Sequence, residues 1–287
     1  MRLDLAYDGT DFAGWARQPG LRTVQGVLEE ALATIFRRDG DTPTITVAGR
    51  TDAGVHATGQ VAHVDLTERQ VARLARPHGA RPAPEPATAL ARRLNGIAGL
   101  TSDVVVRSAT IAPDGFDARF SPVWRSYRYR IADAAAERNP LHRRFTVWHP
   151  NVLDADAMVE AARELLGLHD WAAYCRPRAG ATTIRELQEF SWQRDADGVL
   201  IAHLRADAFC HSMVRALVGA AVAVGEGDLP GERLVGLREE RRRTSEFRVM
   251  PAAGLTLVEV GYPPDDELAA RAAQTRARRD ASFDPGD

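Results

Sequence analysis

The sequence predicts an α+β fold made of two ferredoxin-like halves that share a central cleft. Segments with the two-residue alternation of strands are interleaved with segments that have the apolar spacing of helices. The order β-α-β-β-α-β occurs twice along the chain, although the two copies do not resemble each other in sequence. In the second copy, Asp197-Gly198 separates two apolar runs, which is a strong hairpin signal.

In the first copy, Leu3, Leu5 and Tyr7 alternate with polar or small residues, which indicates a half-buried strand over residues 3–8. Residues 23–36 have the pattern of an amphipathic helix, with Thr23 as the expected N-cap. The remaining predicted elements are strands over 44–50, 60–66 and 103–111 and a helix over 87–97.

The second copy repeats this order over a similar length of chain. Its predicted elements are strands over 124–132, 182–193, 199–206 and 255–261 and helices over 154–167 and 208–225. We therefore expect an N-terminal half at 1–115, a C-terminal half at 116–263, and a peripheral or flexible tail at 264–287. The Pro-, Ala- and Arg-rich stretch 73–87 is expected to be a surface excursion.

The composition narrows the possible chemistry. Apolar residues make up 45% of the 287 residues and charged residues 26%, as in an ordinary folded protein. All 37 basic residues are arginines, so a Schiff-base lysine, a pyridoxal phosphate attachment and a P-loop lysine are excluded. Arginine suits bidentate phosphate contacts, but the net charge of −2 means that any basic surface for nucleic acid must be local.

Two cysteines, Cys175 and Cys210, are too few for a disulfide framework or a cysteine-rich zinc site. Cys210 lies in an apolar run that predicts a helix, so we expect it to be a small buried hydrophobe. The N-terminus MRLDLAYDG is charged and alternating, unlike a signal peptide, and no apolar run is long enough to cross a bilayer. A cytoplasmic protein is the expectation.

Residues 49–61, GRTDAGVHATGQV, place polar side chains between glycines. One interpretation is a structural turn, because glycine is used wherever the backbone needs a positive φ. The other is a carboxylate presented to a substrate on a rigid turn, with Asp52 as that carboxylate. Arg50 and Asp52 are two residues apart, which on an extended segment points both side chains the same way.

Three further stretches could contribute catalytic or ligand-binding residues. AYDGTDF (6–12) mimics a phosphatase signature, but Ala6 stands where that signature has its nucleophilic aspartate. ARFSPVWRSYRYR (118–130) interleaves arginines with aromatic residues, which suits either base stacking with phosphate contacts or an ordinary edge strand. Arg215 lies in a mostly apolar helical run and needs a carboxylate partner, a ligand phosphate or a position at the helix edge.

Taken together, these stretches resemble the bacterial TruA-type tRNA pseudouridine synthases. The hallmark G-R-T-D-A-G-V-H-x-x-G-Q-V is present without a gap at 49–61. Further similarity is found, in chain order, in YDGTDFAGWARQPGLRTVQGVLEEAL (7–32), FDARFSPVWRSYRYRI (116–131), HDWAAYC (169–175), TTIREL (182–187), FCHSMVRALVG (209–219) and GLTLVEVGYP (254–263). The resemblance therefore covers roughly residues 1–263.

The resemblance implies a pseudouridine synthase fold and isomerisation of uridine to pseudouridine at positions 38–40 of the tRNA anticodon arm. It implies a homodimer that binds the tRNA anticodon stem-loop, with neither DNA nor a membrane as partner and with no metal or organic cofactor. By position in the motifs, Asp52 is the catalytic carboxylate and Arg50 contacts the RNA or helps to eject the target base. Arg215 keeps Asp52 ionised, and Tyr127 packs against the target uracil and assists proton transfer.

Some alternatives stay open at this stage. Asp52 could attack the sugar C1′, attack the base C6, or remove a ribose C2′ proton. A protein that binds RNA or acts as a tRNA chaperone could keep the fold without catalysis, although the presence of Asp52 argues against it. A metal-independent hydrolase is a weaker alternative, because neither a Ser–His nor a Cys–His arrangement is present. His63, on a predicted strand, favours a structural hydrogen bond over proton transfer.

Overall fold

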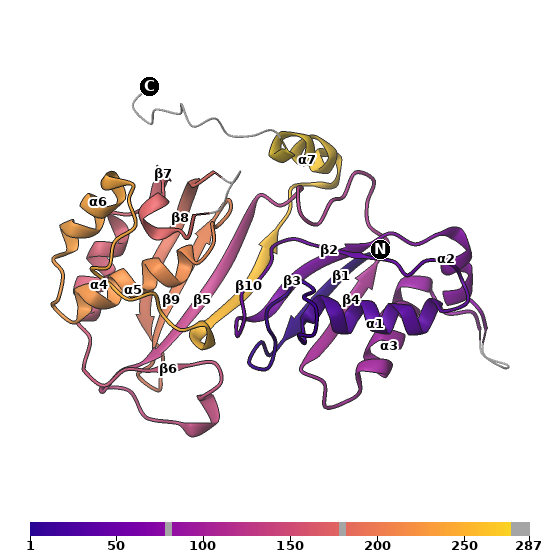
Figure 1. Cartoon of the computed structure of the whole chain (residues 1–287), viewed down its shortest axis with the longest axis horizontal. Coiled ribbons are helices and arrows are strands. Elements are labelled where there is room, and N and C mark those ends of the chain that lie inside the picture. The colour runs from indigo at the N-terminus through magenta and orange to yellow at the C-terminus, as the bar shows by residue number, and fades with distance from the viewer. Residues whose placement is uncertain (78–81, 178–181, 277–287) are drawn as a thin grey trace. The chain divides into compact units, whose positions relative to one another are not determined.

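The computed structural model describes residues 1–77, 82–177 and 182–276, which are coloured from indigo to yellow in Figure 1. The chain divides into two compact units: unit 1 contains 1–122 and 262–276, and unit 2 contains 123–261. In this division, 116–122 and 262–276 belong with the N-terminal unit. The sequence pattern assigns these residues instead to the second half and to a peripheral tail.

Unit 1 is a four-stranded antiparallel sheet with helices. Its strands are β1 (Arg2–Tyr7), β2 (Ile45–Val47), β3 (His56–Val64) and β4 (Val104–Thr110), and its helices are α1 (Val24–Phe36), α2 (Glu68–Leu74), α3 (Pro86–Ala98) and α7 (Leu268–Arg276), the last preceded by a 3-10 turn, Asp265–Glu267. The order across the sheet is β4-β1-β3-β2. This is the order that a β-α-β-β-α-β ferredoxin-like unit requires.

Unit 2 repeats this arrangement with additions. Its strands are β5 (Trp124–Ala132), β6 (Val147–Trp148), β7 (Gly167–Asp170), β8 (Ile184–Arg194), β9 (Leu200–Ala206) and β10 (Leu255–Gly261), and its helices are α4 (Ala155–Arg163), α5 (Met213–Gly225) and α6 (Gly231–Glu240), with short 3-10 turns at Pro140–His142, Ala172–Tyr174 and Ala252–Gly254. The order β10-β5-β9-β8 matches that of unit 1, with β7 added beside β8 and β6 beside β5. The predicted α+β class is confirmed.

Local signals account for several elements. Leu3 and Leu5 are fully buried in β1, as their alternation predicts. Thr23 caps α1, because its hydroxyl accepts a hydrogen bond from the Gly26 N–H at 3.1 Å. Gly198 adopts a φ of 78° in the turn that joins the antiparallel strands β8 and β9, so the hairpin predicted at Asp197-Gly198 is confirmed.

Two predicted boundaries are wrong. The helix predicted over 208–225 begins only at Met213, because Ser212 adopts a left-handed conformation with a φ of 66°. Strand β3 begins at His56, four residues earlier than predicted, so the second part of the 49–61 motif is strand. Of the predicted surface stretch 73–87, residues 78–81 lie outside the described residues. The rest includes the end of α2 and the start of α3.

The two cysteines are joined by a disulfide, Cys175–Cys210, with their Cα atoms 5.8 Å apart. The expectation that Cys210 is a buried hydrophobe in a helix is therefore wrong. Cys210 is partly exposed and lies between β9 and α5, while Cys175 is only 1% exposed.

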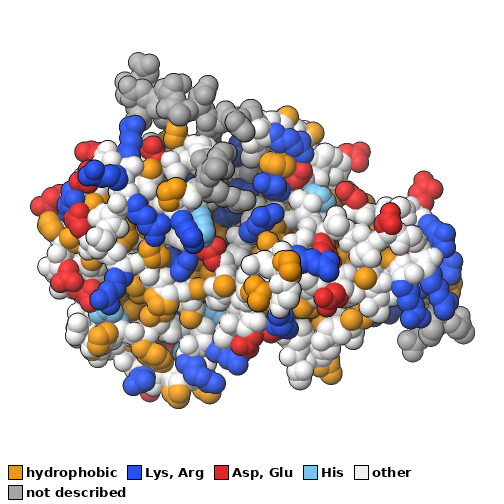
Figure 2. All heavy atoms as spheres, viewed as in Figure 1, with side chains coloured by type: hydrophobic (Ala, Val, Ile, Leu, Met, Phe, Trp, Pro, Cys, Tyr) orange, Lys and Arg blue, Asp and Glu red, His pale blue; other side chains and the backbone are white. Residues whose placement is uncertain are grey.

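The surface carries both signs of charge. Figure 2 shows arginine side chains interspersed with acidic ones on the face in view, in keeping with a net charge close to zero. Among the described residues, no helix is long and apolar enough to cross a membrane.

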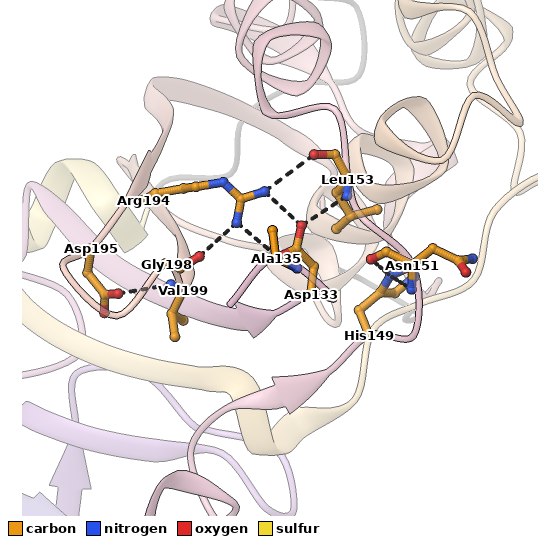
Figure 3. A network of polar contacts seen from close by, with 9 residues as sticks. All are labelled: Asp133, Ala135, His149, Asn151, Leu153, Arg194, Asp195, Gly198 and Val199. Carbon is orange, nitrogen blue, oxygen red and sulfur yellow. Dashed lines mark hydrogen bonds and ion pairs between the residues drawn. The ribbon is translucent and has the colours of Figure 1, made fainter. Parts of the chain in front are cut away.

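An ion pair between the buried Asp133 and the more exposed Arg194 connects three parts of unit 2 (Figure 3). Asp133, just after β5, accepts two hydrogen bonds from the Arg194 guanidinium, at 2.9 and 2.7 Å. It also accepts the N–H groups of Leu153 and Ala135, at 2.9 and 3.3 Å, while Arg194 donates to the Gly198 carbonyl at 2.7 Å. The pair therefore ties the β8–β9 turn to the end of β5 and to the segment before α4.

Burial by itself would raise the pKa of the Asp133 carboxyl, because a charge loses solvation in the interior. The hydrogen bonds from Arg194 and from the Leu153 and Ala135 backbones outweigh this effect, so the pKa of Asp133 lies below its usual value. A depressed carboxyl pKa stabilises the folded state at neutral pH. That contribution is lost as the pH falls below about 4 toward the folded pKa.

We predict that Arg194→Met destabilises the protein by about 3 kcal/mol, because it leaves the Asp133 carboxylate buried without its cation. The free energy of unfolding in urea at pH 7 measures this loss. The difference from the wild type should shrink at acidic pH, where Asp133 takes up a proton. Arg242→Met, at an exposed arginine of the same unit, is the control and should change stability by less than about 0.5 kcal/mol. Equal losses for both variants would contradict the role of the ion pair.

Candidate active site

The four candidate residues lie in two places. Arg50 and Asp52 lie in unit 1, on the connection between β2 and β3. Tyr127 lies on β5 and Arg215 on α5, both in unit 2. The contacts of each pair are therefore described within its own unit.

The connection from β2 to β3 alternates in exposure. Arg50 is exposed, Thr51 is only 7% exposed, and Asp52 is half-buried. The Thr51 side chain reaches the interior of the unit, where its Oγ1 lies 2.8 Å from the Tyr7 hydroxyl. Thr51 thus has a structural role, whereas its neighbours Arg50 and Asp52 are exposed and half-buried, respectively.

A buried polar network holds this connection. Gln60, on β3, is fully buried, and its amide Nε2 donates to the Tyr7 hydroxyl at 3.1 Å and to the Gly49 carbonyl at 2.9 Å. Burial raises the pKa of Tyr7 to about 12, although its hydrogen bonds with Thr51 and Gln60 act in the opposite direction. The phenol therefore stays protonated at neutral pH, so it accepts from Gln60 and still has a proton for Thr51.

Backbone hydrogen bonds also connect this turn to the loop that follows β1. The Trp15 N–H donates to the Thr51 carbonyl at 3.0 Å, and the Gly54 N–H donates to the Phe12 carbonyl at 3.3 Å. Within the turn, the Val55 N–H donates to the Asp52 carbonyl at 3.2 Å. The backbone on both sides of Asp52 is therefore fixed to the loop that follows β1.

Two glycines allow these loops to approach so closely. A Cβ on Gly9 would lie 2.0 Å from the Val55 carbonyl oxygen, so only glycine fits. Gly14 has a φ of 97°, and a Cβ there would lie 3.0 Å from the Thr51 carbonyl oxygen. The loop after β1, which resembles a phosphatase signature, acts here as a support for the Asp52 turn.

The two histidines of this region have structural contacts. The Gly9 N–H donates to Nδ1 of the buried His56 at 3.0 Å. The Ala118 N–H donates to Nδ1 of His63 at 3.0 Å, which confirms the structural hydrogen bond expected for His63. Burial lowers the pKa of His63, more than Asp65 and Asp117 raise it, so the imidazole stays neutral and able to accept at neutral pH.

In unit 2, the Tyr127 side chain contacts the segment that follows β9. Its ring meets the Phe209 ring edge to face, with centroids 5.1 Å apart. Nearby on the same strand, Arg125 donates to the Asp207 carbonyl at 2.7 Å. Tyr127 is partly exposed.

Arg215 lies in the first turn of α5 and donates to two neutral oxygens. Its Nη1 donates to the Met250 carbonyl and its Nη2 to the Ser212 hydroxyl, each at 3.2 Å. The Met250 N–H returns a hydrogen bond to the Arg215 carbonyl at 3.1 Å. These contacts hold the side chain against its own unit.

Sequence reasoning missed the positioning roles of Tyr7, Gln60 and Phe209. One signal was available, because Gln60 is a polar residue on a mostly apolar strand and a buried amide needs partners. Its partners are 53 and 11 residues away, so the pattern alone could not name them.

The family described as tRNA pseudouridine synthase matches residues 5–94 and 161–263, which is more than half of the chain. The chain is 67% identical over 278 residues to the tRNA pseudouridine synthase A of Leifsonia xyli, covering 97% of this chain and 96% of that protein. It is 52% identical to the enzymes of the same name from Streptomyces avermitilis and Mycobacterium leprae, covering 97% of this chain and 93% and 95% of theirs.

These similarities define an RNA-modifying isomerase. The chain belongs to the tRNA pseudouridine synthase family, and the resemblance noted from its motifs is confirmed. Among solved structures, an archaeal box H/ACA Nop10–Cbf5 complex matches with 10% identity and a TM-score of 0.30, covering 77% of this chain and 44% of that one. This score is too low to add to the argument.

We predict that Tyr7→Phe loosens the Asp52 turn, because Gln60 and Thr51 lose their shared partner in the interior. The free energy of local opening should fall by about 1–3 kcal/mol, which amide hydrogen exchange at Trp15, Gly54 and Val55 would report as faster exchange. Tyr262→Phe is the matched control, since it removes a hydrogen bond to the Ala118 carbonyl in the same unit. Faster exchange in both variants, or in neither, would contradict the network.

We also predict that Gly9→Ala displaces the turn, because the added methyl group collides with the Val55 carbonyl. It should destabilise the protein by about 1–3 kcal/mol in thermal unfolding. Gly96→Ala is the control, since Gly96 lies inside α3 with open space around its Cα. That variant should stabilise by about 0.5–1 kcal/mol. A neutral Gly9→Ala would show that the two loops can separate without cost.

Proposed function

We propose that this protein isomerises uridine to pseudouridine at positions 38–40 of the tRNA anticodon arm, with Asp52 as the catalytic carboxylate. The observation that carries the assignment to Asp52 is its place on a turn held by buried side chains, while the carboxylate itself is only half-buried. Family membership supports the reaction and the tRNA substrate.

The reaction requires mainly that the enzyme hold the target nucleotide in the correct position. The base separates from the sugar at N1, rotates and rejoins through C5, with no net oxidation or reduction. The enzyme must hold a flipped-out nucleotide, stabilise charge as it develops and move one proton. One fixed carboxylate can do this by attack on C1′, by attack on C6 or by removal of a C2′ proton, and the proposal covers all three routes.

The other three candidate residues support the reaction in different ways. Arg50, exposed beside the buried Thr51, contacts the RNA or helps to eject the target base. The partly exposed Tyr127 packs against the uracil and assists proton transfer. Arg215 supplies the positive charge that keeps Asp52 ionised in the complex with RNA. The fixed positions of Tyr127 and Arg215 within unit 2 support these roles.

The proposed tRNA substrate indicates what the protein binds and where it acts. The protein binds the tRNA anticodon stem-loop through local arginines, because its net charge of −2 provides no general attraction to RNA. It acts in the cytoplasm, where tRNA is found, and as a homodimer, as expected from the resemblance.

We predict that Asp52→Asn lowers turnover by roughly 1,000-fold or more, because the amide can neither attack nor accept the proton. The assay incubates the protein with tRNA from cells that lack the modification and counts pseudouridine at positions 38–40 by mass spectrometry. Binding of the tRNA should be retained, since the asparagine side chain has nearly the same shape as that of aspartate.

Asp65→Asn is the matched control, because it removes one negative charge at an exposed position of the same unit. It should turn over like the wild type. Unmodified uridines after incubation with the wild-type protein would contradict catalysis and leave an RNA-binding protein. A parallel loss of binding and turnover in Asp52→Asn would mark Asp52 as structural.

A further inference from the structure

The disulfide in unit 2 lies beside the candidate residues of that unit. Cys175 directly follows the 3-10 turn Ala172–Tyr174, and Cys210 lies on the connection from β9 to α5. Their Cα atoms are 5.8 Å apart, within the usual range for disulfides. The two cysteines are 35 residues apart in sequence, so the bond joins two segments that are distant along the chain.

The two sulfurs differ in access. Cys175 is 1% exposed, whereas Cys210 is partly exposed and can be reached by a small oxidant. The exposed residues Arg176 and His211 flank the pair in sequence, and the Arg176 N–H donates to the His211 carbonyl at 2.9 Å. A partly exposed cysteine can be oxidised more readily than a fully buried one.

The same connection carries contacts to both candidate residues of unit 2. Phe209, next to Cys210, packs against Tyr127 with ring centroids 5.1 Å apart. Ser212, two residues after Cys210, accepts the hydrogen bond from Arg215 at 3.2 Å. Any change in the freedom of Cys210 therefore reaches Tyr127 through Phe209 and Arg215 through Ser212.

We propose that Cys175 and Cys210 form a site of reversible thiol oxidation by hydroperoxides, and that the oxidised pair holds Phe209 and Ser212 in the arrangement that favours turnover. The coupling to turnover rests on the proposed function. In the cytoplasm that this function implies, a disulfide is more often redox-active than permanent.

The oxidation balances with a hydroperoxide as the oxidant. The Cys210 thiolate attacks one peroxide oxygen, which breaks the O–O bond and leaves a sulfenic acid and hydroxide. The Cys175 thiolate then attacks the Cys210 sulfur and expels a second hydroxide. The two hydroxides take up the two protons that the thiols released, so hydrogen peroxide gives two waters. A dithiol reductant reverses the step by thiol–disulfide exchange.

The test compares the intact wild-type protein after treatment with hydrogen peroxide and after treatment with dithiothreitol. Each sample is alkylated and weighed by mass spectrometry, and its turnover of tRNA is measured in parallel. We expect the oxidised protein to take up no alkylating group and to be lighter than the reduced protein by two hydrogens before alkylation. We expect kcat/KM to be roughly 10-fold lower in the reduced protein, because residues next to the substrate lose their fixed position.

Cys210→Ala and Cys175→Ala complete the experiment. Each variant should turn over at the level of the reduced wild type and respond to neither reagent. Alkylation of both wild-type thiols after peroxide treatment, or equal turnover in the two states, would overturn the proposal. If the mass change occurs but neither state forms pseudouridine, the thiol site stands and the proposed function fails. The wild-type comparison requires no variant to fold.

Discussion

The hydrogen bond between the Tyr7 and Thr51 hydroxyls is the constraint on which the candidate site depends. Both groups lie in the interior, where a polar atom without a partner costs free energy, so the turn between β2 and β3 cannot leave this position cheaply. Gln60 extends the constraint, because one amide serves both Tyr7 and the Gly49 carbonyl. With Thr51 drawn inward, the exposed Arg50 and the half-buried Asp52 lie on a backbone that is already ordered, so a ligand bound there would cost little conformational entropy.

Unit 2 holds its candidate residues by different means. Arg215 is fixed by a carbonyl and a hydroxyl from two segments, and Tyr127 by the edge of an aromatic ring. Phe209 and Ser212 lie on the connection from β9 to α5, and Met250 lies between α6 and β10. Cys210 of the disulfide lies on the same connection as Phe209 and Ser212. The contacts of both Tyr127 and Arg215 therefore involve the segment from Phe209 to Ser212.

Much of the architecture could be predicted from local patterns. The alternation in β1, the apolar stripe of α1 and the Asp197-Gly198 turn are each contained in a few consecutive residues, and the repeated order indicated the fold class. Short or weakly patterned elements such as α2, α6 and β7 were missed, because a few residues carry too little periodicity. The late start of α5 depends on one positive φ within an apolar run. The motif residues were identified through the resemblance, but their supports join positions far apart in sequence, such as Tyr7 with Thr51 and Cys175 with Cys210.

The shared strand order of the two units gives each turn of one unit a topological counterpart in the other. The connection from β2 to β3 in unit 1 corresponds to that from β8 to β9 in unit 2. In unit 2 this connection is a short turn that contains Gly198. Arg194 donates to the Gly198 carbonyl and to Asp133, so the turn contributes to stability. In unit 1 it is longer and carries the exposed Arg50 and the half-buried Asp52. Two turns at the same place in a repeated topology thus differ in what they contribute, because the short one is fixed by an ion pair of the scaffold and the longer one brings polar side chains toward the surface.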